Sequence, residues 1–353
     1  MPAFLHAIGT AVPAHDVHAA FIDWARAQVE PRAARLFDRM AARAGIGHRW
    51  SVLPTARGGG SPVAPGGFYG GDAHPGTAER MRVYAVEAPA LALAAIEQLR
   101  TQTSLDGITH LVVASCTGFV APGVDQILAT RLGLSSSVER LLIGFMGCYA
   151  AVAALRSARH IVRSDPPARV LVVTVELSTL HLQQVREVEP LLAMLQFGDG
   201  AAAALVTADP GGFALEHPFA AALPQSDQLI RWDITDTGFA MHLSGEVPAR
   251  IAAALADRAL ANAMVGGAAP ADVDGWAVHA GGRSILDAVE NALDLDAQAL
   301  AASRAVLADY GNMSSATLMF VLARLLAGGR VERGVALAFG PGLAAEGFGF
   351  RSA

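Results

Sequence analysis

Short apolar runs rich in β-branched residues alternate along the chain with longer Ala-rich segments that have helical spacing. In the first part of the chain, runs at 110–114, 141–144 and 170–175 predict strands, and segments at 124–132 and 149–162 predict helices. Such alternation is typical of α/β proteins whose strands are covered by helices. We therefore expect an α/β fold with buried strands.

A second set of alternating elements begins near Gly212. Its strands are expected at 276–279 and 335–339, and its helices at 284–293 and 316–327. The order of elements predicts two similar α/β halves, residues 1–211 and 212–353. No repeat is visible at the level of individual residues, so the duplication rests on element order alone.

Glycine and proline interrupt this pattern in two places. The segment from Pro54 to Pro75 predicts a long surface loop, with a functional lid as the alternative. Its glycines are clustered at Gly58-Gly-Gly60, Gly66-Gly67 and Gly70-Gly71. Pro89 lies inside the otherwise helical segment 81–99, and proline removes a backbone donor, so this helix is expected to kink or to begin near Pro89.

Composition excludes several classes of protein. The 353 residues are 53% hydrophobic and 16% charged, yet no apolar stretch reaches the roughly 18 residues of a membrane span. A net charge of -6 argues against nucleic-acid binding, which needs a basic face. The first residues have no basic leader followed by an apolar block, so we expect a cytoplasmic protein. Two cysteines, Cys116 and Cys148, are too few for a disulfide framework or a cysteine-built metal site.

Cys148 follows an apolar run broken by Gly144 and Gly147, and it precedes the helix expected at 149–162. The N-terminus of a helix favours an anion, because its N–H groups are unpaired and its dipole is positive there. A cysteine in this place is expected to have a lowered pKa and to act as a nucleophile. The alternative is a small buried hydrophobic residue, as most free cysteines are.

A thiolate nucleophile needs a base and a group that holds developing negative charge. His279 stands at the end of an expected strand, before two glycines and a helix, and Asn312 stands in a tight turn before another helix. Each motif alone is weak, since a lone histidine is often structural and Asn beside Gly often marks a turn. Three such residues, each at a strand-to-helix junction, favour a catalytic triad.

Five motifs in register carry a family resemblance. They are Met146-Gly-Cys148, Phe197-Gly-Asp-Gly-Ala201, His279 with Gly281-Gly282, Tyr310-Gly-Asn-Met-Ser-Ser315 and Phe339-Gly-Pro-Gly342, with Arg39, Arg43, Cys116-Thr-Gly-Phe119 and Pro122-Gly123 extending the match. The chain resembles the type III polyketide synthases, which are chalcone synthase-like enzymes of the thiolase fold. The resemblance implies a layered αβαβα core, a homodimer, acyl-CoA and malonyl-CoA as substrates, and no separate cofactor or metal.

The resemblance also implies a mechanism. Cys148 would take an acyl starter from its CoA thioester and hold it, while His279 would pair with the thiolate. His279 and Asn312 would then donate hydrogen bonds to the malonyl thioester oxygen as CO₂ leaves, and such donors are worth a few kcal/mol each, roughly. The carbanion would attack the Cys148 thioester in a Claisen condensation. Repetition would give a chain that cyclises to a pyrone or a phenolic ring.

Further residues are implied to bind the substrates. Those of the acyl cavity are Phe197, Met241, Ser178, Phe339 and Gly340, and those of the CoA tunnel are Arg39, Arg43, Gly281, Gly282 and Ser314. His181 falls at another position that shapes the cavity. Without the family, Phe197 could equally be a core aromatic residue, and Arg39 and Arg43 could line a solvated helix face. Cys116 has no comparable partners and is expected in the cavity or the core.

Departures from the family pattern concern substrate choice. Leu36 stands at the third basic position for CoA phosphates, Ala280 replaces a frequent proline, and Ala338 replaces a glycine. Met241 replaces a phenylalanine, and because methionine is flexible we expect an aliphatic starter and an alkylpyrone or alkylresorcinol product. The alternatives are a ketoacyl synthase III-like enzyme that stops after one extension and a non-catalytic partner subunit of such an enzyme.

Overall fold

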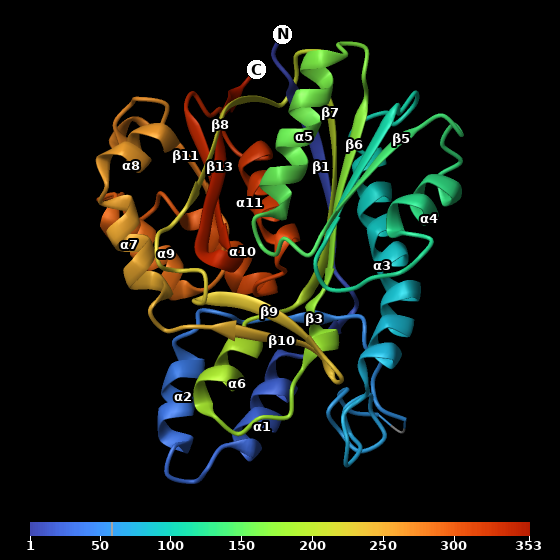
Figure 1. Cartoon of the computed structure of the whole chain (residues 1–353), viewed down its shortest axis with the longest axis vertical. Coiled ribbons are helices and arrows are strands. Elements are labelled where there is room, and N and C mark those ends of the chain that lie inside the picture. The colour runs from blue at the N-terminus through green and yellow to red at the C-terminus, as the bar shows by residue number, and fades with distance from the viewer. Residues whose placement is uncertain (58) are drawn as a thin grey trace.

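The computed structural model describes residues 1–57 and 59–353, apart from the side chain of Arg258. Nine strands form one mixed sheet in the order β11-β12-β13-β8-β1-β7-β6-β4-β5 (Figure 1). Their bounds are β1 Phe4–Ala11, β4 His110–Ser115, β5 Glu139–Gly144, β6 Val170–Leu177, β7 Asp199–Thr207, β8 Phe213–Ala222, β11 Gly275–Val278, β12 Gly334–Gly340 and β13 Ala344–Ser352. Two small sheets pair β2 (His15–Asp16) with β3 (Trp50–Ser51) and β9 (Ile230–Thr235) with β10 (Gly238–Leu243).

Helices cover both faces of the sheet. The sheet bends, and helices α5 and α11 lie between its two halves (Figure 1). The α-helices are α1 His18–Gln28, α2 Ala34–Ala42, α3 Thr77–Arg100, α4 Val124–Arg131, α5 Ala150–Ser164, α6 Val188–Met194, α7 Val247–Leu255, α8 Arg258–Met264, α9 Arg283–Ala292, α10 Ala301–Tyr310 and α11 Ser315–Leu326. Short 3₁₀ turns lie at Ser178–His181, Pro270–Asp272 and Pro341–Leu343. Helix α3 packs on β1, β6 and β7, α10 packs on β11, and α5 and α11 fill the space between the two arms of the sheet. The predicted α/β class with layered helices and strands is confirmed.

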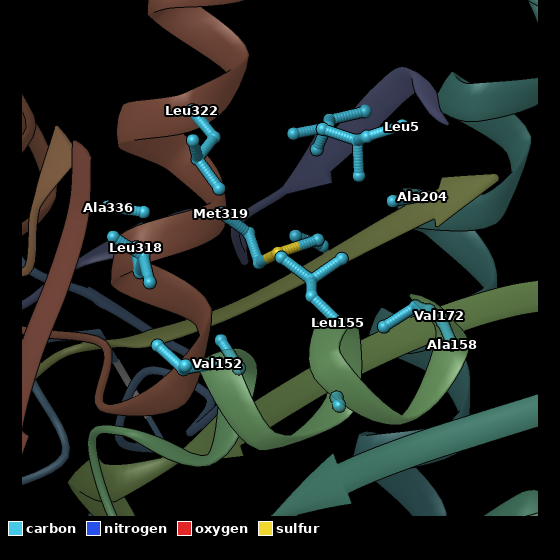
Figure 2. Packing of buried hydrophobic residues seen from close by; sticks show 14 of the residues in the cluster. Leu5, Val152, Leu155, Ala158, Val172, Ala204, Leu318, Met319, Leu322 and Ala336 are labelled. Carbon is cyan, nitrogen blue, oxygen red and sulfur yellow. The ribbon is translucent and has the colours of Figure 1, made fainter. Parts of the chain in front are cut away.

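The middle layer contains a large apolar core. Val152 and Leu155 of α5 meet Leu318 and Met319 of α11, and Figure 2 shows these side chains pointing toward one another. All four are fully buried. Burial of a side chain of this size contributes about 1.5–3 kcal/mol, so this layer fixes the two helices that begin beside Cys148 and Asn312.

The expected elements form close to their predicted bounds, with two exceptions. Helix α3 begins at Thr77 and runs unbroken through Pro89, so the expected start near Pro89 is wrong. Ala88 and Pro89 are buried against the sheet, and this packing offsets the lost backbone hydrogen bond. Strand β5 is an edge strand whose residues are mostly exposed, which differs from the expected buried strand.

The Gly-rich segment 54–75 has no helix or strand among its described residues, as predicted, while Gly58 lies outside them. Its Tyr69 is buried, and the Tyr69 hydroxyl donates to the carbonyl of Thr179 at 2.7 Å. The loop is therefore anchored to the protein interior at this point. Among the described residues, no helix combines the length and apolarity needed to cross a membrane.

Candidate active site

Cys148 lies in a tight turn between β5 and α5. Gly147 has a φ of +78°, and a Cβ on it would come within 2.4 Å of the Pro341 ring. Phe145 also has a positive φ of 56°, which is costly for an aromatic residue and is typical of functional sites. The amide of Ala150 donates to the carbonyl of Gly147 at 3.0 Å and starts the helix two residues after Cys148. The expected turn before a helix is confirmed.

The end of β12 packs directly on this turn. A Cβ on Gly340 would come within 2.5 Å of the Tyr149 ring and 3.4 Å of the Cys148 amide nitrogen, so glycine permits the close approach. Phe339, the neighbour of Gly340, lies in the apolar core around Trp276 and Val278. Both residues were predicted to shape the acyl cavity. Within the part of the chain that the structure describes, they support the turn and the core and do not line the cavity found below.

Asn312 and Ser314 lie beside the thiol of Cys148. The Ser314 hydroxyl donates to Cys148 Sγ at 3.7 Å, and the Asn312 side chain lies close enough to lower the pKa of the thiol. Asn312 Oδ1 accepts from the Ser314 amide at 2.8 Å, while Asn312 Nδ2 donates to the carbonyl of Gly281 at 3.1 Å. Ser314 has a φ of +47°, a strained conformation that this network maintains. The structure thus brings Cys148, Asn312 and Ser314 together.

His279 follows β11 and is joined to Asn312 through the Gly281 carbonyl. Its ring is buried, and neither ring nitrogen has a hydrogen-bond partner among the described residues. Burial lowers the pKa of His279 to about 3, so the imidazole is neutral at pH 7. A buried imidazole with two free nitrogens is a site where a ligand or a reacting group can bind.

The pKa of Cys148 contradicts the expectation of a lowered value. Burial raises the pKa of the thiol to about 12, although hydrogen bonds from Ser314 and Asn312 act in the opposite direction. Desolvation penalises the thiolate more than the nearby helix N-terminus stabilises it. In the free protein, Cys148 and His279 are therefore a neutral thiol and a neutral imidazole.

A buried carboxyl group lies behind the nucleophile, and the sequence did not identify it. Glu176 accepts hydrogen bonds from the Cys116 amide at 3.0 Å, from Thr117 Oγ1 at 2.9 Å and from the Ser315 hydroxyl. Burial raises the pKa of Glu176 to about 7 against these bonds. Cys116 Sγ lies 3.1 Å from the Ser314 hydroxyl, so Cys116 connects Glu176 to the residue that contacts Cys148. Cys116 is buried beside the site, as expected.

A narrow cavity of about 20 Å³, which is roughly the space for one water molecule, lies beside Phe197. Its wall contains three of the predicted substrate residues, Phe197, Met241 and Ser178. The remaining lining residues are Phe21, Arg49, Thr179, His181, Leu182, Met194, Trp232 and Phe239. His181 was named from the sequence as a cavity position. Trp232 and Arg49 were missed, although Trp232 is the cross-strand partner of Met241 in the β9–β10 hairpin and alternation along that hairpin could have indicated it.

Aromatic rings close the cavity. The rings of His181 and Phe239 are stacked with centroids 4.2 Å apart, and the Trp232 ring stands edge-on to His181 at 5.7 Å. His181 is held in one orientation, because its Nε2 lies 2.7 Å from the Thr117 carbonyl and its Nδ1 accepts from the Phe239 amide at 3.1 Å. Burial lowers the pKa of His181 to about 3, so it is neutral at pH 7.

An apolar groove lies on the surface beside Gln196, the neighbour of Phe197 in the chain. It is lined by Leu36 and Met40 of α2, by Gln196, and by residues of α6, α7 and α9. Arg39 on α2 and Arg43, which caps the C-terminus of α2, are exposed, and the carbonyl of Arg43 accepts from Arg283 at the start of α9. A Cβ on Gly282 would come within 2.3 Å of Gln196 Oε1, so Gly282 packs against one residue of this groove. The predicted CoA residues Arg39, Arg43, Gly281 and Gly282 are not among its lining residues, and their role stays a prediction.

Comparisons with known proteins give a consistent result. Residues 1–210 match the profile of the N-terminal domain of chalcone and stilbene synthases, and residues 215–353 match that of the C-terminal domain. Pks18 of Mycobacterium tuberculosis strain H37Rv, described as an α-pyrone synthesis polyketide synthase-like protein, is 35% identical over 251 residues, 68% of this chain. That match spans 64% of the length of Pks18. Type III polyketide synthase C of Arabidopsis thaliana is 35% identical over 267 residues, which are 70% of this chain and 69% of that protein.

Solved structures have the same architecture. PKS-I of the brown alga Ectocarpus siliculosus superimposes with a TM-score of 0.87 at 30% identity, over 100% of this chain and 98% of that one. The C-terminal type III polyketide synthase domain of Steely1 from Dictyostelium gives a TM-score of 0.90 at 24% identity, over 100% and 99% of the two chains. The second likeness concerns the fold alone.

Proposed function

The chain belongs to the chalcone and stilbene synthase family of type III polyketide synthases, and on that premise we propose that it is a decarboxylating acyltransferase that extends an acyl-CoA starter with malonyl-CoA. The family predicted from the motifs is thus confirmed. The observation that carries the proposal is the cluster at Cys148. There, a thiol in a strained turn contacts Ser314, Asn312 bonds the Gly281 carbonyl, and His279, two residues before Gly281, has no hydrogen-bond partner for either ring nitrogen among the described residues.

In the loading step, Cys148 Sγ attacks the carbonyl carbon of the acyl-CoA thioester. The bond between that carbon and the CoA sulfur breaks, so the acyl group is transferred to Cys148. Because the thiol is neutral in the free protein, its proton must leave during the attack, and the neutral His279 imidazole is a suitable acceptor. The proton then goes to the departing CoA sulfur, which leaves as a thiol.

In the extension step, the malonyl thioester loses CO₂, and the electron pair of the broken bond forms an enolate. Asn312 uses one N–H of its amide for Gly281 and has a second N–H to donate to the enolate oxygen. His279 can donate a second hydrogen bond to the same oxygen. Donors fixed before the charge develops lower the barrier, because no reorganisation is needed. The enolate carbon then attacks the Cys148 thioester, forms a carbon–carbon bond and expels Cys148 as a thiolate. The extended chain is now a CoA thioester, and attack of this thiolate on it returns the chain to Cys148 and releases CoA for the next round.

We propose an α-pyrone as the product, formed from an aliphatic starter after few extensions. The cavity beside Phe197 is narrow and closed by aromatic rings, which limits the length of the chain that it holds. Pks18, a relative of this chain, is described as acting in α-pyrone synthesis. Ring closure by an enol oxygen of the chain on its own thioester would release a lactone and restore the thiol without added water. An alkylresorcinol is the alternative product.

We also propose that the protein is a homodimer that pairs along β5. This strand is the edge of the nine-stranded sheet, and its Leu141 and Leu142 are 43% and 45% exposed. Phe119, 48% exposed, lies next to the strand, since its ring is 3.8 Å from the Cβ position of Gly144. A long exposed apolar edge strand is normally covered by another chain. A second copy of this chain would bury it.

Product analysis tests the proposed function. The protein is incubated with radiolabelled malonyl-CoA and a series of acyl-CoA starters, and the products are identified by mass spectrometry. We expect lactones that contain at least two malonyl-derived units, and none with Cys148→Ala. A single β-keto product would identify the one-extension enzyme instead. A protein that forms no product and loads no acyl group on Cys148 would be the non-catalytic partner.

A further inference from the structure

Three exposed arginines from two helices lie close to the apolar surface groove. Arg39 is on α2, Arg43 caps the C-terminus of that helix, and Arg283 is the first residue of α9. Arg39 and Arg43 are four residues apart, so they lie on the same side of α2. Met40, the chain neighbour of Arg39, and Ser284, the chain neighbour of Arg283, both line the groove. The arginines are therefore placed at the edge of the groove.

A contact with the backbone holds Arg283 at the end of α2. The Arg283 guanidinium donates through Nη1 to the carbonyl of Arg43 at 3.4 Å. The aliphatic part of Arg283 packs on Gly45, because a Cβ on Gly45 would lie 3.7 Å from Arg283 Cδ. Gly45 has a φ of +72°, which glycine adopts without strain. Although Arg283 belongs to α9, its side chain is thus fixed beside Arg43.

Acidic side chains compensate little of this charge. Among the described residues, neither Arg39 nor Arg43 forms an ion pair. Arg283 Nε lies 3.6 Å from Asp287 Oδ2, but Arg304 bonds the other oxygen of that carboxylate at 2.8 Å. The Arg283 side chain is 54% exposed, so its pair with Asp287 is weak in water. On a chain with a net charge of -6, this local excess of positive charge indicates a site for an anion.

The groove has the size of a site for a small molecule. Its volume is about 460 Å³, and such sites typically have about 300–1,000 Å³. Gln196 is among its lining residues, and the Gln196 carbonyl accepts from the Asn312 amide at 2.8 Å. A ligand with an anionic end at the arginines and an arm in the groove would therefore lie next to a residue that bonds the backbone of the catalytic centre.

We propose that Arg283 binds a phosphate group of the CoA thioesters together with Arg39 and Arg43. It thereby takes the place of the basic side chain expected at the position of Leu36, which lines the groove and has no charge. This proposal rests on the proposed function, because it takes CoA thioesters as the substrates. CoA joins a diphosphate and a ribose phosphate to a flexible arm, which matches arginines beside a groove. The Arg43 carbonyl uses one N–H of the Arg283 guanidinium, so others can donate to phosphate oxygens.

The test compares malonyl-CoA with malonyl-pantetheine, which has the same thioester and arm but lacks the diphosphate and the ribose phosphate. The rate of CO₂ release is measured for the wild type and for Arg283→Gln. We expect Arg283→Gln to raise KM for malonyl-CoA about three- to tenfold with kcat unchanged, as for a charge-assisted hydrogen bond in contact with water. The kinetics with malonyl-pantetheine should not change. This difference should decrease at high salt, because salt screens exposed charges.

Calorimetric titration with CoA repeats the comparison without catalysis. The Kd of CoA should rise by the same factor in Arg283→Gln and by less in Arg283→Lys, which keeps the charge. An equal Kd in the wild type and in Arg283→Gln would overturn the proposal, while lactone products from the wild type would leave the polyketide synthase activity intact. If the Kd of CoA depends on Arg283 but the wild type forms no product, the proposed function fails and the phosphate site remains.

Two further variants separate the site from a general loss of charge or of folding. Arg330→Gln is the matched control, because Arg330 is 62% exposed but lies between α11 and β12, outside the residues of the groove. It should keep the wild-type Kd of CoA. Leu36→Lys in the Arg283→Gln background returns a positive charge to the groove and should restore most of the affinity. Affinity as low as that of Arg283→Gln alone would contradict a phosphate site between α2 and α9.

Discussion

Phe197 and Asn312 are joined by an isolated parallel β-bridge, in which the Gly198 amide donates to the Asn312 carbonyl at 3.0 Å and the Asn312 amide donates to the Gln196 carbonyl at 2.8 Å. The bridge fixes the cavity wall relative to the residue that contacts the nucleophile. The position of the cavity wall at Phe197 is therefore coupled to the position of Asn312 through the backbone. Substitutions at Asn312 should alter chemistry without displacing Phe197, because the bridge uses backbone groups only.

Asn312→Asp should nearly abolish release of CO₂ from malonyl-CoA. The substitution keeps an acceptor for the Ser314 amide but removes both donors of Nδ2, and it places a carboxylate oxygen against the Gly281 carbonyl. Loss of one such donor typically reduces kcat by about 10²–10³. The measurement is release of labelled CO₂. Cys148→Ala is the matched control, because it should lose condensation but keep decarboxylation. Decarboxylation at the wild-type rate in Asn312→Asp would exclude the proposed role of the amide.

Alkylation of Cys148 should be slow at neutral pH and should accelerate as the pH rises. Burial raises the pKa of the thiol to about 12, so the thiolate fraction grows by about tenfold for each pH unit below that value. Iodoacetamide labelling with mass spectrometric assignment between pH 6 and 10 measures this dependence. We expect no plateau in the range. A plateau below pH 8 would show that His279 and the helix N-terminus stabilise the thiolate in the free protein after all.

The sequence predicted many of the elements because the periodicity of apolar residues reflects the face that each helix or strand buries. Cys148, His279 and Asn312 could be selected as candidates because each stands where a strand or turn meets a helix. The raised pKa of Cys148 could not be predicted from the sequence, because desolvation depends on side chains that approach from distant parts of the chain. Arg49 also escaped notice, because its burial against Phe197 joins positions 148 residues apart.

Glu176 should make the protein less stable as the pH rises from about 4.5 to about 7. Its pKa is raised from 4.5 to about 7 by burial, so in this range the folded state binds more protons than the unfolded state. The free energy of unfolding then falls with increasing pH. Glu176→Gln should flatten this slope in urea denaturation, although Asp199, with a pKa raised to about 7, retains part of it. Glu97→Gln, on the exposed side of α3, should leave the slope unchanged.

Leu142→Glu should convert the dimer to a monomer. The substitution places a charge in the centre of the exposed edge strand β5, where two copies would have to bury it. Size-exclusion chromatography with light scattering measures the mass. Leu36→Glu is the control, because Leu36 is 44% exposed but lies on α2, away from β5 (Figure 1). A wild-type protein that is monomeric at micromolar concentration would contradict pairing along β5.

Trp232→Ala should lengthen the product. The Trp232 ring lines the cavity, stands edge-on to His181 at 5.7 Å and lies 6.4 Å from the ring of Phe197. Its removal opens space beside Met241, its cross-strand partner, so a chain on Cys148 can be extended further before it cyclises. Mass spectrometry of products from one starter should show additional malonyl-derived units or acceptance of longer starters. Trp24→Ala, on α1 and outside the cavity wall, should keep the wild-type product. Because Trp232 is only partly buried, its loss should lower the free energy of unfolding by less than the about 3–5 kcal/mol of a core tryptophan. An unchanged product from a folded variant would mean that the cavity does not limit chain length.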